Sequence, residues 1–270
     1  MLGWLFPSSS PVDEELRLWI ESRARWIVLH YPDLIEFPVR LPLREDFPEP
    51  YERSHDAASA LMRRIQSYLG LGQERIRLAF YTEGDGLDEL RLRYGAEGIT
   101  SKGAAGTFHG GGFRGQRGAG LSTISINESS LASEIRLAAT LAHELGHFIL
   151  LERGKPGGDL EDHEQLTDLL TIYSGFGIFT ANSINYSSST SDGIWTSWQV
   201  GRLGYLSAEI AGYALALYAK LRGEPKPKWR TFLDTDPRAY FEQSRRFLDR
   251  RYGKGPLTPD RLDGQDDFLD

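Results

Sequence analysis

One short stretch of the 270-residue chain combines residue types that hold metal ions with the spacing such a site needs. His143, Glu144 and His147 form an H-E-x-x-H motif. A helix turns by about 100° per residue, so the two histidines fall within about 40° of each other, where both imidazoles can bind one metal ion. Glu144 projects to the side, too far round for an ideal ligand but well placed to hold a water molecule. The motif therefore predicts a metal centre with an adjacent general base.

A third ligand must come from elsewhere, because a catalytic zinc ion takes three protein ligands and keeps one position open. The chain has no cysteine, so His, Asp and Glu must supply the ligands. The metzincin arrangement is excluded, because Leu150 and Arg153 stand where that motif has glycine and histidine. The next predicted helix carries Glu164 and Asp168, four residues apart on one face. We predict that Glu164 completes a site for one Zn²⁺ per chain and that Asp168 accepts the free ring N–H of a ligand histidine.

The identity of the third ligand has two alternatives in the same segment. His163 stands next to Glu164 and about 100° round the helix from it, and could replace it as the ligand. Asp168 is the second alternative. Both residue types bind zinc, so the residues alone leave this choice open.

A hydrolytic site also needs a group that stabilises the oxyanion or contacts the substrate. Each of four residues is by itself a candidate for this role: His109, Tyr173, Tyr186 and Arg202. The first and third of these fall in predicted loops, where site residues concentrate. Tyr173 lies on the helix face opposite Glu164, which counts against it. His163 is a further candidate for a substrate contact.

The motif and the helix that follows it resemble the gluzincins, the thermolysin-like and related zinc metallopeptidases. Five residues match that pattern position by position: His143, Glu144, His147, Glu164 and Asp168. The resemblance covers residues 122–176, about a fifth of the chain, and implies hydrolysis of peptide bonds by a metal-activated water with Glu144 as general base. It also implies that residues 122–127 form an edge strand that could pair with an extended substrate peptide. No histidine follows His163, so the chain departs from thermolysin in lacking a downstream histidine for the transition state.

Two further stretches, residues 163–183 and 204–224, are also similar to a set of uncharacterised bacterial proteins of metallopeptidase type. This second likeness implies no additional chemistry. The gluzincin resemblance alone leads us to expect a protein or peptide as the substrate.

Regular elements must hold these residues in place, and hydrophobic periodicity predicts where they lie. We expect six helices, at residues 12–31, 57–69, 131–153, 164–176, 206–222 and 237–252. We expect two strands, at residues 75–81 and 122–127. The apolar residues on one side of each helix predict its core face. On the helix 131–153 they are Leu137, Ala138, Leu141, Leu145, Phe148 and Ile149. On the helix 164–176 they are Leu166, Leu169, Leu170 and Tyr173, and on the helix 206–222 they are Ile210, Tyr213, Leu215 and Leu217.

Two segments between these elements read as loops. Residues 103–120 hold eight glycines and predict a flexible loop or hairpin, and residues 182–193 are rich in Ser and Asn. Gly110–Gly115 formally match G-x-G-x-x-G, but they do not open a helix within a βαβ unit. We therefore expect either a mobile flap beside the active site or a plain disordered loop, rather than a nucleotide site.

The elements together predict an α+β fold, mainly helical, with a small mixed sheet packed on the H-E-x-x-H helix in a zincin-like arrangement. We expect one domain over residues 1–254. Its parts are an N-terminal helix and Pro-rich passage at 1–54, a catalytic core at 55–180 and a helical part at 181–254. Residues 255–270 are acidic and predict a flexible tail.

Composition limits the partners. The chain has 31 Lys and Arg against 38 Asp and Glu, a net charge of −7, which argues against a nucleic-acid binder. The local clusters of Lys and Arg at 226–230 and 245–251 predict a solvated helix face. No segment reaches the roughly 18 apolar residues of a membrane span, and the first ten residues do not resemble a signal peptide. We therefore expect a cytoplasmic protein that has no membrane as a partner. The sequence leaves the oligomeric state open.

Two other functions fit the same residues. One is a non-hydrolytic zinc-binding sensor or protein-interaction module built on a zincin-like fold. The other is hydrolysis of an amide that is not a peptide. The position of Glu144 between the two histidines favours an enzyme, because the motif offers it no evident structural role.

Overall fold

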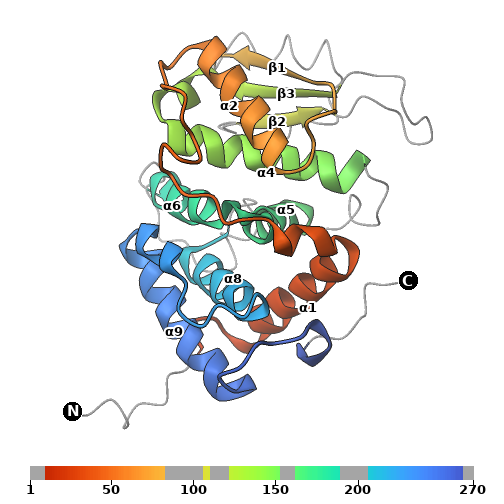
Figure 1. Ribbon diagram of the computed structural model, residues 1–270, viewed down its shortest axis with the longest axis vertical. Coiled ribbons are helices and arrows are strands. Elements are labelled where there is room, and N and C mark those ends of the chain that lie inside the picture. Colours follow the sequence, from red (N-terminus) through yellow and green to blue (C-terminus); the bar gives the residue numbers. More distant parts are fainter. Residues whose placement is uncertain (1–9, 83–105, 110–121, 153–161, 189–205, 264–270) are drawn as a thin grey trace. The chain divides into compact units, whose positions relative to one another are not determined.

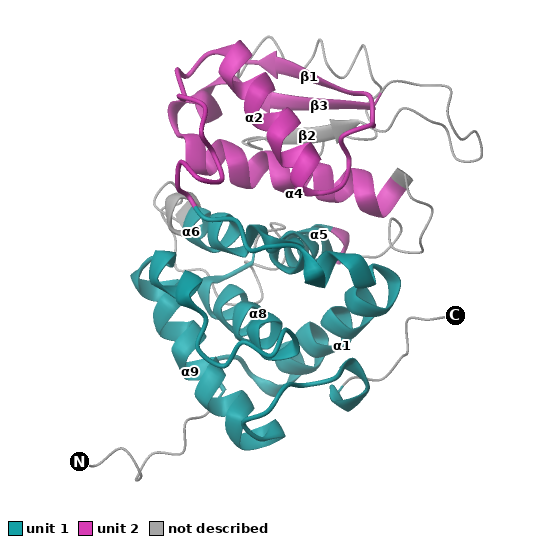
Figure 2. Ribbon diagram, viewed as in Figure 1, with its two compact units in different colours: residues 1–41, 164–270 teal, residues 42–163 magenta. Residues whose placement is uncertain are grey.

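A computed structural model shows the fold as two compact units, drawn in separate colours in Figure 2. One consists of residues 42–163 and the other of residues 1–41 with 164–270. The structure describes residues 10–82, 106–109, 122–152, 162–188 and 206–263. The class is α+β, as predicted. That residues 1–254 fold as a single domain stays a prediction.

The unit of residues 42–163 is built on a three-stranded mixed sheet (Figure 1). Strand β3 (Ser122–Asn127) pairs in parallel with β1 (Ile76–Tyr81) and antiparallel with β2 (Gly106–His109). The bounds predicted for β3 are confirmed, but its expected place at the edge of the sheet is wrong. It lies at the centre, and all six of its residues are buried. β2 falls within the segment expected to be a flexible loop or hairpin.

Two helices of this unit pack on the sheet. α2 (His55–Tyr68) contacts β1, α4 (Glu134–Glu152) contacts β2, and the two helices contact each other. They therefore cover one face of the sheet, and the predicted packing of the sheet on the H-E-x-x-H helix is confirmed. The Ser54 side chain caps α2 by accepting a hydrogen bond from the Ala57 N–H, and a short 3₁₀ turn, η3 (Glu128–Ala132), leads into α4. The core face predicted for α4 is buried throughout.

The unit of residues 1–41 and 164–270 is helical, and α8 (Ala208–Leu221) lies at its centre (Figure 1). Every residue of α8 from Ile210 to Lys220 is buried, which confirms the core residues predicted there. Around it lie α1 (Glu14–His30), α6 (Gly177–Ser188) and α9 (Thr235–Tyr252), each in contact with α8. Short 3₁₀ turns complete the unit: η1 (Pro32–Glu36), η6 (Lys228–Phe232) and η7 (Pro259–Arg261).

After residue 163 the chain returns to this unit along α5 (His163–Thr171). This helix is joined to α6 by a π-helical turn, η4 (Ile172–Phe176), which is kinked at Gly175, a residue with non-helical backbone angles. The prediction of a loop from residue 182 onward is wrong for the residues up to Ser188, because α6 extends to Ser188. Ser and Thr hydroxyls are tolerated here because they bond back to carbonyls of the same helix: Thr180 donates to the Phe176 C=O and Ser183 to the Thr180 C=O.

Gly175 is the residue that makes the π-helical turn fit. It has φ +92, a left-handed conformation that favours glycine. Its carbonyl accepts a hydrogen bond from the Arg40 N–H at 2.9 Å, and a Cβ atom at this position would lie 2.6 Å from the Pro38 carbonyl oxygen. The turn between α5 and α6 therefore has no room for a side chain.

Gly175→Ala is expected to lower the free energy of unfolding by about 2–4 kcal/mol, because it adds backbone strain and a clash with backbone. Urea unfolding followed by circular dichroism measures the change. Two glycines serve as controls. Gly253 has φ +83 but open space around its Cβ position, so Gly253→Ala reports strain alone, and Gly255→Ala should have no effect. Equal losses at Gly175 and Gly253 would show that the close approach to Pro38 costs nothing.

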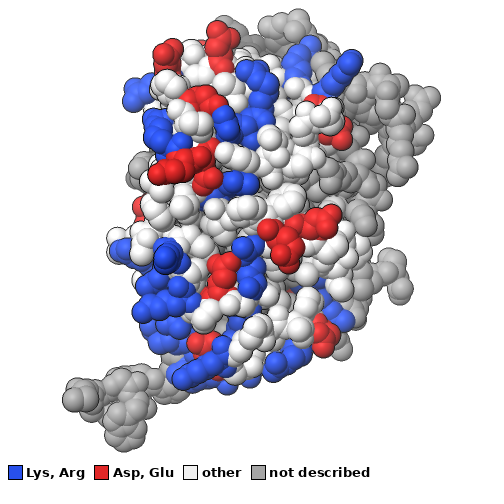
Figure 3. Space-filling model, in the orientation of Figure 1, with Lys and Arg blue, Asp and Glu red and all other residues white. Residues whose placement is uncertain are grey.

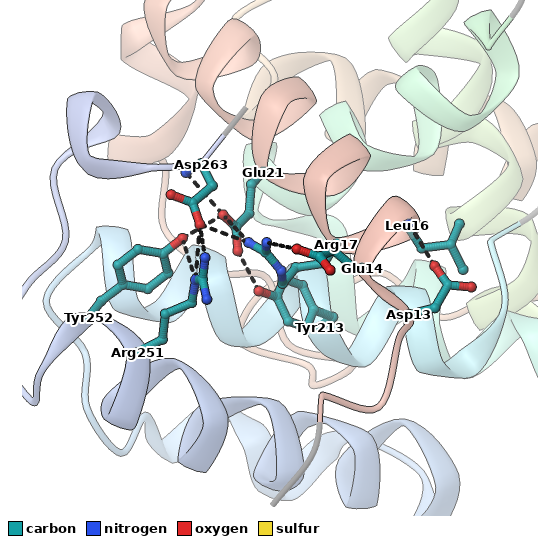
Figure 4. Close-up of polar contacts among 9 residues, drawn as sticks. All are labelled: Asp13, Glu14, Leu16, Arg17, Glu21, Tyr213, Arg251, Tyr252 and Asp263. Atoms are coloured by element: carbon teal, nitrogen blue, oxygen red, sulfur yellow. Dashed lines mark hydrogen bonds and ion pairs between the residues drawn. The ribbon is translucent and has the colours of Figure 1, made fainter. Parts of the chain in front are cut away.

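The tail expected to be flexible from residue 255 onward is packed as far as Asp263. Leu257 and Leu262 are buried, and the Leu257 N–H donates to the Lys220 C=O. The Asp263 carboxylate pairs with the guanidinium groups of Arg17 and Arg251 (Figure 4). The hydrogen bond from Arg251 is the main cause that lowers the pKa of Asp263. Charges contributed by distant parts of the chain thus hold this acidic segment in place.

Lys and Arg side chains gather over α9 on the face shown in Figure 3. Arg246, Arg250 and Arg251 are exposed, as a solvated helix face requires. Arg230 and Arg245 are only half-exposed, and both pair with Glu242. Among the described residues, no helix has both the length and the apolar character needed to cross a membrane.

Candidate metal centre

The two histidines of the motif face each other on α4. The Nε2 atoms of His143 and His147 lie 3.0 Å apart, and their rings meet edge to face with centroids 4.6 Å apart. His147 is buried and His143 is half-buried. The prediction that both side chains share one face of the helix is therefore confirmed.

This spacing suits two nitrogen ligands of one metal ion. Tetrahedral zinc with Zn–N bonds of about 2.0–2.1 Å separates two nitrogen ligands by roughly 3.3 Å. Without a cation, two neutral imidazoles at 3.0 Å would share a single N–H as donor and acceptor. A cation would instead take the lone pairs of both nitrogens at nearly the same separation. The pair thus needs little movement to become two ligands.

Glu164, in the first turn of α5, offers a third candidate ligand atom. One of its carboxylate oxygens and the ring nitrogens of the two histidines all lie within 4.8 Å of one another. In the part of the chain that the structure describes, this is the one group of three or more His, Asp or Glu side chains close enough to hold a metal ion. Glu164 is exposed. Two imidazoles and a carboxylate fit zinc, and the same donor set accepts other divalent ions.

Glu144 lies between the histidines in sequence but not among the ligand atoms. It is 4% exposed, and it is absent from the group of three. Burying a carboxylate costs free energy unless nearby charge or hydrogen bonds compensate it, and a divalent cation at the histidines would add such compensation. The group of candidate ligands thus leaves Glu144 out, and its action beside a metal ion stays a prediction.

Asp168 is buried on α5, one turn after Glu164. Its Oδ2 atom accepts a hydrogen bond from the backbone N–H of Leu206 at 3.2 Å, which holds the segment that leads into α8. The carboxylate thus has a structural contact that the sequence did not suggest. Its predicted hydrogen bond to a ligand histidine stays a prediction.

Tyr173 is placed in the core of its unit. Its side chain is fully buried and packs edge to face against Tyr218 with ring centroids 5.4 Å apart. Burial raises its pKa well above the ordinary value. A substrate cannot reach this hydroxyl, so the prediction of Tyr173 as an oxyanion donor or substrate contact is wrong.

Two of the other predicted donors, His109 and Tyr186, lie in regular elements rather than in the predicted loops. His109 is the last residue of β2, where its register partner is Thr123. Tyr186 belongs to α6 rather than to a loop. Arg202 and the segment Gly110–Gly115 lie outside the described residues.

His163 makes a ring contact with His147 that was not predicted from the sequence. Its ring stacks on that of His147 with centroids 4.7 Å apart and planes inclined by 24°, while its nitrogens are not part of the ligand group. Its place immediately before Glu164 is the only signal of this role in the sequence.

Comparisons of the chain with models of protein families, with curated proteins and with solved structures found no match. The site is therefore described by its own geometry. It is a group of two histidines and one glutamate compatible with a metal ion, with a buried glutamate beside it.

Proposed function

We propose that the protein is a zinc-dependent metallopeptidase, in which His143, His147 and Glu164 hold one ion and Glu144 is the general base. The observation that carries the proposal is the convergence of two imidazoles, whose Nε2 atoms lie 3.0 Å apart, and a carboxylate oxygen within 4.8 Å of a ring nitrogen of each. The gluzincin pattern of the same five residues supports it, with Asp168 as the fifth.

When bound, zinc supplies a Lewis acid that polarises a carbonyl group and lowers the pKa of water. Glu144 then has two tasks that follow from its position on α4. Its carboxylate takes a proton from the attacking water and later gives it to the leaving amine. Its burial keeps bulk water away from that proton transfer.

An extended peptide has a place to bind on the sheet. β2 packs against α4 and, among the described strands, has β3 as its one neighbour, so it is the edge strand of the sheet that the described residues form. A substrate strand can add to such an edge through main-chain hydrogen bonds. β2 therefore takes the role that the resemblance assigned to residues 122–127.

Metal content tests the centre directly. Wild-type protein is expected to hold about one zinc ion per chain after dialysis, and Glu164→Ala is expected to lose it, because two histidines alone leave the site short of a ligand. Elemental analysis of both proteins measures this. Glu15→Ala is the matched control, because Glu15 is also an exposed carboxylate in the first turn of a helix.

A wild-type protein that takes up no metal after addition of zinc would overturn the proposal and reduce the motif to a polar helix face. Retention of zinc by Glu164→Ala would instead show that Glu164 is not the third ligand. His163 and Asp168 would then be the candidates for the third ligand.

A further inference from the structure

The ring of His163 lies against a ligand without being one. It stacks on His147 with planes inclined by 24°, whereas the ring of His143 meets His147 edge to face at 85°. His147 is thus held by one ring on its face and by another at its edge. The Nε2 atom of His147 points at that of His143, as the 3.0 Å separation shows.

The direction of a histidine ligand depends on the torsion that rotates its ring. This torsion is broad for histidine, so the side chain alone does not fix where Nε2 points. A second ring parallel to the first restricts the rotation, because turning His147 would open the stacked contact. The structure holds the ring with its Nε2 atom facing that of His143, where an ion bound by both would lie.

We propose that His163 is a positioning residue of the metal centre, and that the site uses its aromatic ring rather than its nitrogens. The inference rests on the proposed function, since it concerns the same ion. The next residue in the chain is the predicted ligand Glu164, so the first turn of α5 both supports one ligand and supplies another.

The chain contains a natural control for this contact. His55 is the first residue of α2, as His163 is of α5, and its ring stacks on Phe80 with centroids 3.9 Å apart and planes inclined by 7°. Neither His55 nor Phe80 belongs to the ligand group. Loss of the His55 ring removes a similar stacked contact at a similar helix position without touching the metal centre.

The test compares zinc affinity in the full-length chain by competition with a chromogenic chelator. His163→Phe keeps the ring and removes both nitrogens, whereas His163→Gln keeps polar groups and removes the ring. We expect His163→Phe to bind zinc within about 3-fold of wild type, since the stacked contact remains. We expect His163→Gln to bind at least about 10-fold more weakly, the usual effect of losing a group that orients a ligand. His55→Gln should match wild type.

The visible absorption of the cobalt-substituted proteins supplies a second readout, because its intensity and position report the ligand set. We expect His163→Phe to keep the wild-type spectrum. A spectrum altered in His163→Phe, together with weak zinc binding, would show that a nitrogen of His163 is a ligand and would overturn the inference.

Wild-type affinity in His163→Gln would overturn it as well, because the ring would then have no role. If His163→Gln folds poorly, His163→Leu makes the same comparison with His163→Phe, since both are apolar and only one has a ring. A wild-type chain that binds no zinc would overturn the metal centre itself, so failure of the proposed function is recognised before the variants are compared.

Discussion

Replacing Glu144 by Gln is expected to lower the rate of peptide hydrolysis by about 10²–10⁴-fold while the chain keeps its metal ion. Glutamine has nearly the same shape but cannot take a proton from water. Glu144 is not one of the three ligand groups, so the change leaves the ion's donors in place. Loss of rate without loss of metal is the result that separates a general base from a ligand.

The measurement pairs zinc content with kcat/KM on a peptide selected from a mixed peptide library by mass spectrometry. Glu134→Gln is the control on the same helix, because Glu134 lies in the first turn of α4 and pairs with Arg44. Full turnover by Glu144→Gln would show that another group is the base. Zinc binding by wild type without cleavage of any peptide in the library would favour the non-hydrolytic sensor or interaction module.

The second large effect is expected far from the motif, at Glu21 of α1. Its carboxylate is fully buried and is surrounded by donors from four parts of the chain (Figure 4). The bonds come from the Arg17 guanidinium at 3.2 Å, the hydroxyls of Tyr213 at 2.5 Å and Tyr252 at 2.6 Å, and the backbone N–H of Asp263 at 3.1 Å. Burial, and then the hydrogen bond to Glu21, raise the pKa of Tyr252 to about 12, so this tyrosine stays a neutral donor.

Glu21→Gln is expected to lower the free energy of unfolding by about 3–5 kcal/mol. An amide has one acceptor oxygen, and its NH₂ group would face donors. The buried Arg17 would also lose a counter-charge. Urea unfolding followed by circular dichroism measures the loss.

Glu14→Gln is the matched control for Glu21→Gln. Glu14 lies on the same helix and pairs with the same Arg17 at 3.6 Å, but its side chain is 83% exposed. Its replacement should change the free energy of unfolding by less than about 1 kcal/mol, as is usual for exposed ion pairs. Equal effects of the two changes would contradict the importance of burial at Glu21.

Local patterns in the sequence were sufficient to predict much of the candidate site. The spacing of His143 and His147 placed both rings on one helix face, and the apolar residues on the opposite arc are buried as expected. The limits of β3 were also predictable from its alternating sequence. These features depend on contacts within one element, where periodicity carries the information.

Features that depend on distant contacts were not predictable. The order of strands places Ser122–Asn127 at the centre of the sheet, and nothing in those six residues states how many neighbours they have. The acidic segment up to Asp263 was predicted to be a flexible tail. Arg17, one of the partners of Asp263, lies 246 residues away, so no local pattern indicates this contact. The helix through Ser188 was obscured by Ser and Asn, which favour loops unless their side chains bond within the helix.

The division of the helical unit into residues 1–41 and 164–270 has a consequence for the time course of synthesis. α1 leaves the ribosome before α8 and α9, and the N–H of Asp263, which completes the shell around Glu21, follows 242 residues after Glu21. At about 5–20 residues per second this interval lasts roughly 10–50 s. For most of this interval, until α8 (Ala208–Leu221) has been made, the apolar side of α1, including Ile20 and Ile27, lacks the helix that covers it in the finished protein. Nascent chains stalled before α8 should therefore expose α1 to chaperones and proteases, whereas chains released after Asp263 should protect it.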